Sequence, residues 1–511
     1  MSFNSIGFAF FFALVFAVYF LPVMARARRQ NILLLCASYF FYGVWDWRFL
    51  SLIVLTTLVS WGGALAMERW RRSARSICVA GVAVNLLVLG FFKYFNFFGE
   101  NLAYLMRLLG FPFDWVVTDI MLPVGISFYT FQAIGYSIDV YRREVAPTRD
   151  LLLFATFIAY FPQLVAGPIE RASRLLPQLS VTRSWSRGES VEGLRRILWG
   201  LVKKVAIADQ CAVYVDRVWG TELLTGHDAV AVFVAVLLFS VQIYCDFSGY
   251  CDIAVGTSRI LGIRLMENFR RPYFALSVFD FWRRWHVSLM EWFRNYVYIP
   301  LGGSRVSRGR LFGNVFVVFL LSGLWHGASW CYVLWGVYWA VVCGTARVFG
   351  FSAGKERVAS ASAADICRMA GTLVFVVVGW GIFRSRTLAQ CGEYVLQAIL
   401  PLTLLAATAA CAGYRILLLL VSRKYGRRLL RCAAVVVCAG IVVVFPAALL
   451  VRLYWPLTLV VLVCEWRTRD RADRLFPLPD RRLHRYVVYA LLYLAVVTAP
   501  DSEAQFIYFQ F

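Results

Sequence analysis

The sequence predicts an all-α membrane protein that crosses the bilayer many times. Of its 511 residues, 61% are hydrophobic and only 16% are charged, a balance that soluble domains do not show. Many apolar runs approach the ~20 residues that a helix needs to span a bilayer. Because these runs are continuous rather than alternating, they favour helices over a membrane β-barrel.

The apolar runs follow one another along the chain without a soluble domain between them. The first run has no basic residue before it and no small-residue cleavage site after it, so we predict a permanent span rather than a signal peptide. No internal repeat is visible, and we predict a single membrane domain over residues 1–511 with about eleven to thirteen membrane segments, some too short to cross fully. The clearest candidates are 6–24, 49–67, 77–98, 228–247, 311–325 continuing into 328–345, 369–387 and 400–421.

Basic residues concentrate in short loops between the apolar runs and give a formal net charge of +23. Such loops are typical of the cytoplasmic side of a membrane protein. Residues 1–25 and 486–511 contain no lysine or arginine, so both chain ends are expected outside a bacterial cytoplasmic (inner) membrane. Because membrane spans enclose the basic segments, nucleic acid is not expected as a partner. The main clusters are Arg26, Arg28, Arg29; Arg69, Arg71, Arg72, Arg75; Arg423, Lys424, Arg427, Arg428, Arg431; and Arg467, Arg469, Arg471, Arg474, Arg481, Arg482, Arg485.

The thirteen cysteines suggest neither a disulfide framework nor a metal site. They are odd in number, occur singly, mostly within apolar runs, and form no CxxC pair or other metal-ligand spacing. Buried free thiols that act as small hydrophobic side chains are the better interpretation. No bound metal is predicted.

Three stretches interrupt the helical pattern, at 121–128, 161–170 and 299–304. Each combines at least one proline with at least one glycine in a largely apolar context. Irregular backbone at membrane depth is tolerated only where protein or a water-filled cavity covers it. We therefore predict re-entrant segments that line a cavity around the histidines described next. Ordinary helix kinks or loop ends are the alternative interpretation.

Two of the four histidines stand in contexts that indicate chemistry. His326 interrupts the apolar run 324–330, and an ionisable side chain at membrane depth is costly and usually retained for function. His286 ends the basic, aromatic stretch 281–286. Imidazole titrates near neutrality and can accept and return a proton during a reaction. The alternatives without chemistry are a packed His326 between Trp325 and Trp330 and an interfacial His286.

Base-catalysed acyl transfer, metal binding and proton relay are the reactions that two such histidines could support. A metal is disfavoured because no carboxylate lies close to either histidine in a ligand spacing. The sequence also lacks a GxSxG nucleophile elbow and an HExxH motif.

The segment 259–310 carries ten arginines against three acidic residues, interleaved with aromatic side chains. This pattern is typical of a helix at the membrane interface, and also of a site for an anionic ligand, because guanidinium groups match phosphate oxygens. The candidate residues for binding an acyl donor are Arg283, Arg284, Trp282, Trp285 and Asn295. Asp246 and Asp280 could orient a histidine or pair with basic residues, and we favour the pairing.

Several motifs resemble the membrane-bound O-acyltransferase superfamily, specifically the alginate O-acetyltransferase type of its bacterial branch. The resemblance covers residues 1–350 well, as a core, and the C-terminal helices 351–511 weakly. Asn295 and Ser304 depart from the family pattern, in which aspartate and asparagine are common at these places. The matching stretches are PVGISFYTFQ (123–132), GPIER (167–171), YCDFSGY (244–250), DFWRRWH (280–286), YIPLGG (298–303) and LWHG (324–327).

The resemblance implies a ring of helices around a central pore, with His326 as the catalytic base and His286 as a second functional histidine. It further implies acetyl-CoA as the cytoplasmic donor, a partner acetyltransferase outside the membrane, and an extracytoplasmic polysaccharide such as alginate as acceptor. Peptidoglycan and cellulose are alternative acceptors. Two other hypotheses are a proton-coupled transporter or flippase, which the absence of repeated halves disfavours, and a non-catalytic docking subunit.

Overall fold

The computed structural model describes residues 1–349 except 112, 114, 116–119, 166 and 222, together with 363–399, 455–468, 482–500 and 506. Within this part every regular element is a helix, which confirms the predicted all-α class. Short 3₁₀ turns and π-helical stretches connect the α-helices. The α-helices are α1 (Ile6–Tyr19), α2 (Ala27–Asp46), α3 (Leu50–Arg69), α4 (Ala74–Leu108), α5 (Ile126–Tyr141), α6 (Leu151–Ala159), α7 (Phe161–Leu164), α8 (Ala172–Ser180), α9 (Arg187–Leu201), α10 (Asp209–Trp219), α11 (Ala229–Ile260), α12 (Val278–Arg284), α13 (Val287–Phe293), α14 (Arg308–His326), α15 (Trp330–Val348), α16 (Ala363–Arg384), α17 (Leu388–Tyr394), α20 (Trp455–Arg467) and α21 (Arg482–Val497).

Six helical stretches in the described residues are long and apolar enough to cross a membrane. They include the predicted spans between 49 and 98, at 228–247 and from 311 to 387. The first predicted span forms the shorter apolar helix α1, and the one at 400–421 lies outside the described residues. The six stretches are Ala27–Arg69, Arg71–Leu108, Ala229–Ile260, Arg308–His326, Trp330–Val348 and Ala364–Arg384.

Several buried helices are too short to cross a bilayer. Helix α6 has nine residues, and α12 and α13 have seven each. At 1.5 Å per residue such helices are at most about 14 Å long, against roughly 30 Å of hydrocarbon. They have the length expected of the partial membrane segments that the sequence predicted.

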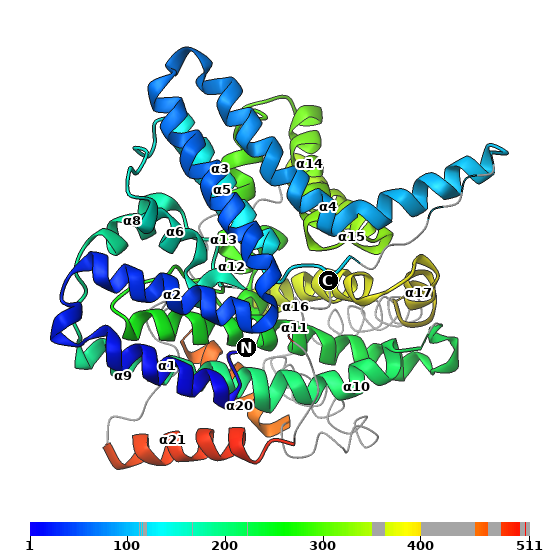
Figure 1. Ribbon diagram of the computed structural model, residues 1–511. Coiled ribbons are helices and arrows are strands. Elements are labelled where there is room, and N and C mark those ends of the chain that lie inside the picture. Colours follow the sequence, from blue (N-terminus) through cyan, green and yellow to red (C-terminus); the bar gives the residue numbers. More distant parts are fainter. Residues whose placement is uncertain are drawn as a thin grey trace.

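Helix α11 runs through the middle of the molecule and organises its neighbours (Figure 1). Helices α9 and α10 pack along it, and α14 and α15 form an antiparallel pair above it in this view. Helices α3, α4 and α5 pack against one another beside that pair. The histidines lie where these groups meet, since His326 ends α14 and His286 precedes α13.

Glycines allow α9 and α11 to approach closely. A Cβ atom at Gly256 would lie 2.6 Å from the carbonyl oxygen of Gly193, and one at Gly200 would lie 2.5 Å from that of Gly249. Small residues at such contacts are the usual way in which membrane helices pack tightly. The contact therefore depends on glycine on both helices.

We expect Gly256→Ala to destabilise the protein by about 1–3 kcal/mol, because the added methyl group must push the two backbones apart. Thermal unfolding in detergent measures the change. Gly81→Ala is the matched control, since nothing lies within 4 Å of a Cβ there and alanine has the higher helix propensity. Equal unfolding midpoints for Gly256→Ala and Gly81→Ala would contradict a close contact between α9 and α11.

Candidate active site

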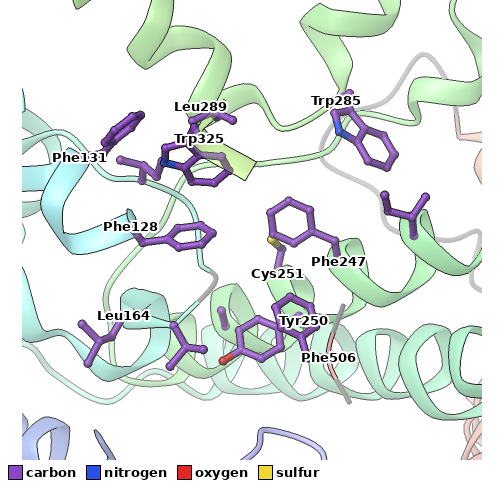
Figure 2. Close-up of a cluster of buried hydrophobic side chains, with 14 of the residues drawn as sticks. Phe128, Phe131, Leu164, Phe247, Tyr250, Cys251, Trp285, Leu289, Trp325 and Phe506 are labelled. Atoms are coloured by element: carbon purple, nitrogen blue, oxygen red, sulfur yellow. The ribbon is translucent and has the colours of Figure 1, made fainter. Parts of the chain in front are cut away.

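Both histidine rings lie against one indole ring. The Trp325 centroid is 5.7 Å from the His286 ring and 5.0 Å from the His326 ring, and both contacts are edge-on. Both imidazoles are buried, with exposed fractions of 1% and 6%. The rings of Phe128 and Phe247 complete the surroundings of His286 at 6.4 and 4.7 Å. Figure 2 shows Phe128, Phe247 and Trp325 in this cluster of buried side chains.

Helix α14 ends at His326, and α4 binds the last carbonyl groups of that helix. Lys93 Nζ donates to the carbonyl oxygens of Trp325 and His326 at 2.5 and 2.9 Å, and the Tyr94 hydroxyl donates to that of Leu324. The final carbonyl groups of a helix have no partner within it and carry partial negative charge. Lys93 therefore fixes the backbone that carries His326.

Replacing Lys93 with methionine is expected to lower kcat about 10-fold or more while the KM for the donor changes little. Hydrogen bonds to a charged group contribute about 1.5–3 kcal/mol, and here they hold the end of the helix rather than a substrate. Steady-state kinetics on purified protein measures both constants. Tyr94→Phe removes a neutral bond from the same helix end and should have the smaller effect. An unchanged kcat for Lys93→Met would contradict the positioning role.

His286 occupies the sharp turn between α12 and α13. Its φ of 44° lies in the left-handed region, which is strained for a residue with a side chain and is found at functional sites. Two backbone hydrogen bonds hold the turn, from Val287 N–H to the Asn268 carbonyl at 2.9 Å and from Arg270 N–H to the Arg284 carbonyl at 2.8 Å. His286 lies outside the six candidate spans, and burial lowers its pKa to about 3. The imidazole is therefore neutral near pH 7.

A cavity of about 60 Å³ opens beside His326 and is lined by Lys93, Val165, Trp325 and residues 122–128. Two of the three predicted breaks meet there. Gly125 has a φ of 75°, and a Cβ atom on it would lie 2.5 Å from the carbonyl oxygen of Leu164. Glycine is therefore needed both for the turn and for the contact.

The third predicted break, at 299–304, lies elsewhere. The carbonyl oxygens of Leu301 and Gly303 accept hydrogen bonds from Asn314 Nδ2 at 3.3 and 3.0 Å. Asn314 precedes His326 by twelve residues, which is about 18 Å along α14. This break forms the turn before α14 and does not line the cavity, so the prediction that all three breaks surround the histidines is wrong for 299–304.

A larger, basic pocket of about 330 Å³ lies beside Asn268, which contacts His286. Arg196 binds Asp252 at 2.9 Å and also pairs with Glu267, while Lys203 pairs with Asp252. Six basic and four acidic side chains line the pocket, so it is positive overall. These are Arg196, Lys203, Arg270, Arg271, Arg283 and Arg284 with Asp252, Glu267, Asp280 and Glu465.

The cavity and the pocket are lined by different residues. His326 lies at the turn between α14 and α15 and lines the cavity. Asp280, Arg283 and Arg284 line the pocket, and the Phe279 ring of α12 lies 5.7 Å from the Arg347 guanidinium in the last turn of α15. The basic residues and His326 thus line separate openings.

The candidate donor-binding residues separate into three places. Arg283 and Arg284 line the basic pocket. Trp282 and Trp285 are buried among other aromatic rings and do not line it. Asn295 borders a separate cavity of about 10 Å³. Only the two arginines are therefore placed to meet a donor in the pocket.

The candidate carboxylates pair with basic residues, as the sequence analysis favoured. Asp246 lies 2.7 Å from Lys204 Nζ, and Asp280 lies 2.9 Å from Arg284 Nε. Asn268 lies within hydrogen-bonding distance of His286, with its Oδ1 atom 3.2 Å from His286 Nδ1.

No cluster of three potential metal ligands occurs among the described residues, and every described cysteine is a free thiol.

Paired histidines between a basic pocket and a second cavity, within a helical membrane domain, indicate a membrane enzyme that transfers an acyl group. Comparison with known proteins identifies the family. The model of the membrane-bound O-acyltransferase family matches residues 142–349, a stretch that contains both His286 and His326.

The chain belongs to the membrane-bound O-acyltransferase family and is an O-acyltransferase. It is 40% identical over 392 residues to the probable alginate O-acetylase of Pseudomonas putida, a match that covers 76% of this chain and 78% of that protein. It is 33% identical over 383 residues to the peptidoglycan O-acetyltransferase of Helicobacter pylori, with coverage of 70% and 71%. A teichoic acid D-alanyltransferase of Bacillus subtilis is 31% identical over 233 residues, with coverage of 43% and 57%.

Proposed function

We propose that this protein transfers an acetyl group from cytoplasmic acetyl-CoA toward an extracytoplasmic polysaccharide, with His326 as the base. The observation that carries the proposal is that each histidine adjoins a different opening: His326 lines the smaller cavity, and His286 contacts Asn268 at the edge of the basic pocket. A donor in the pocket and an acceptor in the cavity can thus both reach the histidine pair. Alginate is the acceptor that the comparison favours, because the relative with 40% identity is a probable alginate O-acetylase.

The basic pocket suits the phosphate groups of the donor. Arg270 and Arg283 are exposed and form no ion pair with a carboxylate in the described part of the chain, whereas Arg196 and Lys203 are paired with Asp252 and Glu267. Guanidinium groups bind phosphate oxygens in a bidentate manner. We therefore assign the nucleotide end of acetyl-CoA to Arg270, Arg283 and Arg284, with the thioester directed toward His286.

The smaller cavity beside His326 suits the acceptor hydroxyl. A buried imidazole can draw the proton from this hydroxyl as its oxygen attacks the thioester carbonyl carbon. The new carbon–oxygen bond forms, the carbon–sulfur bond breaks, and the proton passes to the departing thiolate to give free CoA. Lys93 holds the His326 backbone at the wall of the same cavity.

The proposed orientation places the protein in a bacterial inner membrane with its N-terminus outside. The basic loops, including the Arg69–Arg75 region, then face the cytoplasm, in agreement with the bias of basic residues toward that side. A soluble acetyltransferase outside the membrane would receive the acetyl group and pass it to the polymer. The other proposed partners are membrane lipid and the acyl donor.

Purified protein in lipid nanodiscs with radiolabelled acetyl-CoA tests the transfer. Release of CoA that depends on an added acceptor, and that His326→Ala abolishes, supports the proposal. Proton-coupled uptake of a solute into proteoliposomes without CoA release would contradict it. Acetylation assays with alginate, peptidoglycan fragments and cellulose oligomers, each with and without a periplasmic extract, then identify the acceptor and the need for a partner.

A further inference from the structure

Asn268 stands between the basic pocket and His286. It lies 18 residues before this histidine, is buried with an exposed fraction of 2%, and borders the pocket. Its Oδ1 atom lies 3.2 Å from His286 Nδ1, 3.2 Å from Ser288 N and 3.0 Å from Ser288 Oγ. Its Nδ2 atom lies 3.4 Å from Cys251 Sγ. The oxygen of the amide therefore contacts His286 and Ser288, and its nitrogen contacts Cys251.

The backbone of Ser288 determines which end of the amide faces the histidine. A backbone N–H group can only donate a hydrogen bond, so the Asn268 atom that it meets must be the acceptor, the oxygen. The same oxygen meets His286 Nδ1. Because an amide oxygen can only accept, Nδ1 must carry the hydrogen. In a neutral imidazole the basic lone pair then belongs to Nε2.

We propose that Asn268 is a positioning residue that holds His286 in the Nδ1–H tautomer and so presents a basic Nε2 atom at the active site. This inference rests on the proposed function only for its consequence in catalysis. The tautomer itself follows from the hydrogen bonds of the folded protein. Partners that fix the tautomer and orientation of a functional imidazole commonly change activity 10- to 100-fold when removed.

An uncharged partner suits this location better than the carboxylate that the sequence analysis considered. A carboxylate beside the ring would raise the pKa of the imidazole, and its own charge would be costly to bury among aromatic rings. The rings of Phe128, Phe247 and Trp325 surround His286. The titratable groups on the elements that pack near it include His326 on α14 and Asp246, Cys251 and Asp252 on α11. Asn268 orients the ring without adding charge.

Substitution of Asn268 separates orientation from simple packing. Asn268→Leu removes the acceptor and should lower kcat about 10- to 100-fold. Asn268→Asp keeps an acceptor for Nδ1–H and should recover much of that loss at alkaline pH. Its negative charge should also move the acid limb of the rate profile up by about 1–3 pH units. If Asn268 only fills space, Asn268→Asp should not recover activity at alkaline pH. The acid limb of its rate profile should then also stay where it is in the unmodified protein.

Asn31 provides the matched control. It is also a buried asparagine with both ends bonded, to the Leu179 carbonyl at 2.9 Å and to Arg183 Nη2 at 2.8 Å, and it borders neither cavity. Asn31→Leu and Asn31→Asp should alter the unfolding midpoint and leave the pH profile as in the unmodified protein. If Asn31→Asp shifted the pH profile as well, the same shift in Asn268→Asp would not be evidence that Asn268 orients His286.

A measurement that needs no turnover tests the tautomer directly. Solid-state NMR of the full chain in bilayers with ¹⁵N-labelled histidine distinguishes protonated from unprotonated ring nitrogens, and His286→Gln identifies the signals of this ring. A protonated Nδ1 and a bare Nε2 are expected. Protonation at Nε2, or Asn268→Leu kinetics equal to those of the unmodified protein, would overturn the proposal. Lack of CoA release from the unmodified protein would instead refute the proposed function and leave the tautomer result standing.

Discussion

Replacing His326 with alanine is expected to lower the rate of acetyl transfer by about 10²- to 10⁴-fold, the range that loss of a general base produces. The imidazole lies between the indole of Trp325 and the cavity proposed for the acceptor, and no other described histidine borders that cavity. The measurement is CoA release from acetyl-CoA by purified protein at a saturating donor concentration. The KM for the donor should change little, since His326 does not line the basic pocket.

Two further histidine variants make this result specific. His484→Ala removes an exposed histidine of α21 and should leave the rate unchanged. His286→Ala should also reduce kcat, and the double variant with His326→Ala should lose little more than the worse single variant, because groups that act as a unit are not additive. A glutamine at 326 with normal turnover would refute base catalysis by this residue.

Removal of Arg283 and Arg270 together should raise the KM for acetyl-CoA about 10-fold or more. Hydrogen bonds to a charged group are worth about 1.5–3 kcal/mol, and these two guanidinium groups are the pocket arginines that no described carboxylate neutralises. The KM for S-acetylpantetheine, which has the same thioester without the nucleotide phosphates, should stay nearly constant. Steady-state kinetics with the two donors measures the difference.

Salt and a control arginine sharpen this test. Raising the ionic strength should raise the KM for acetyl-CoA in the unmodified protein more than in the double variant, because salt screens exposed charges. Arg264→Ala, which removes an exposed arginine bound to Glu189 at 2.9 Å outside the pocket, should behave as the unmodified protein. An equal loss with both donors would show that the arginines act on folding or on the thioester and not on phosphate.

The two histidines stand out in the sequence more clearly than the residues around them. His286 and His326 were identifiable because each is unusual in its local context, and the structure brings both to one indole ring. The rule that selected His326, a costly ionisable group within an apolar run, also applies to Lys93 in the run 77–98, and it would have found this residue. Asn268 offered no such signal, because a single asparagine in a polar loop is common.

The candidate donor-binding residues lie in different surroundings for a physical reason. Because α12 turns by about 100° per residue, Trp282 and Arg283 face different sides of the helix, and Trp285 follows the end of the helix in an extended conformation. Arg283 and Arg284 reach the pocket while Trp282 and Trp285 pack into the interior. The composition of such a segment does not distinguish the residues that face the pocket from those that face the core. The break at 299–304 was similarly grouped with the histidines although it belongs to the start of α14.

By itself the sequence determined that this chain forms helices within a membrane, and it singled out the two imidazoles on which the proposed chemistry depends. Both follow from local properties, since a run of apolar residues satisfies its backbone only as a helix and an isolated ionisable residue is costly wherever the chain places it. Only the tertiary structure shows the contact between Asn268 and His286, the support of His326 by Lys93, and the charge of the basic pocket. Those features join residues far apart in the chain, from α4, α9, α11, α12 and α20, and only the packing of these helices determines which donor meets which acceptor.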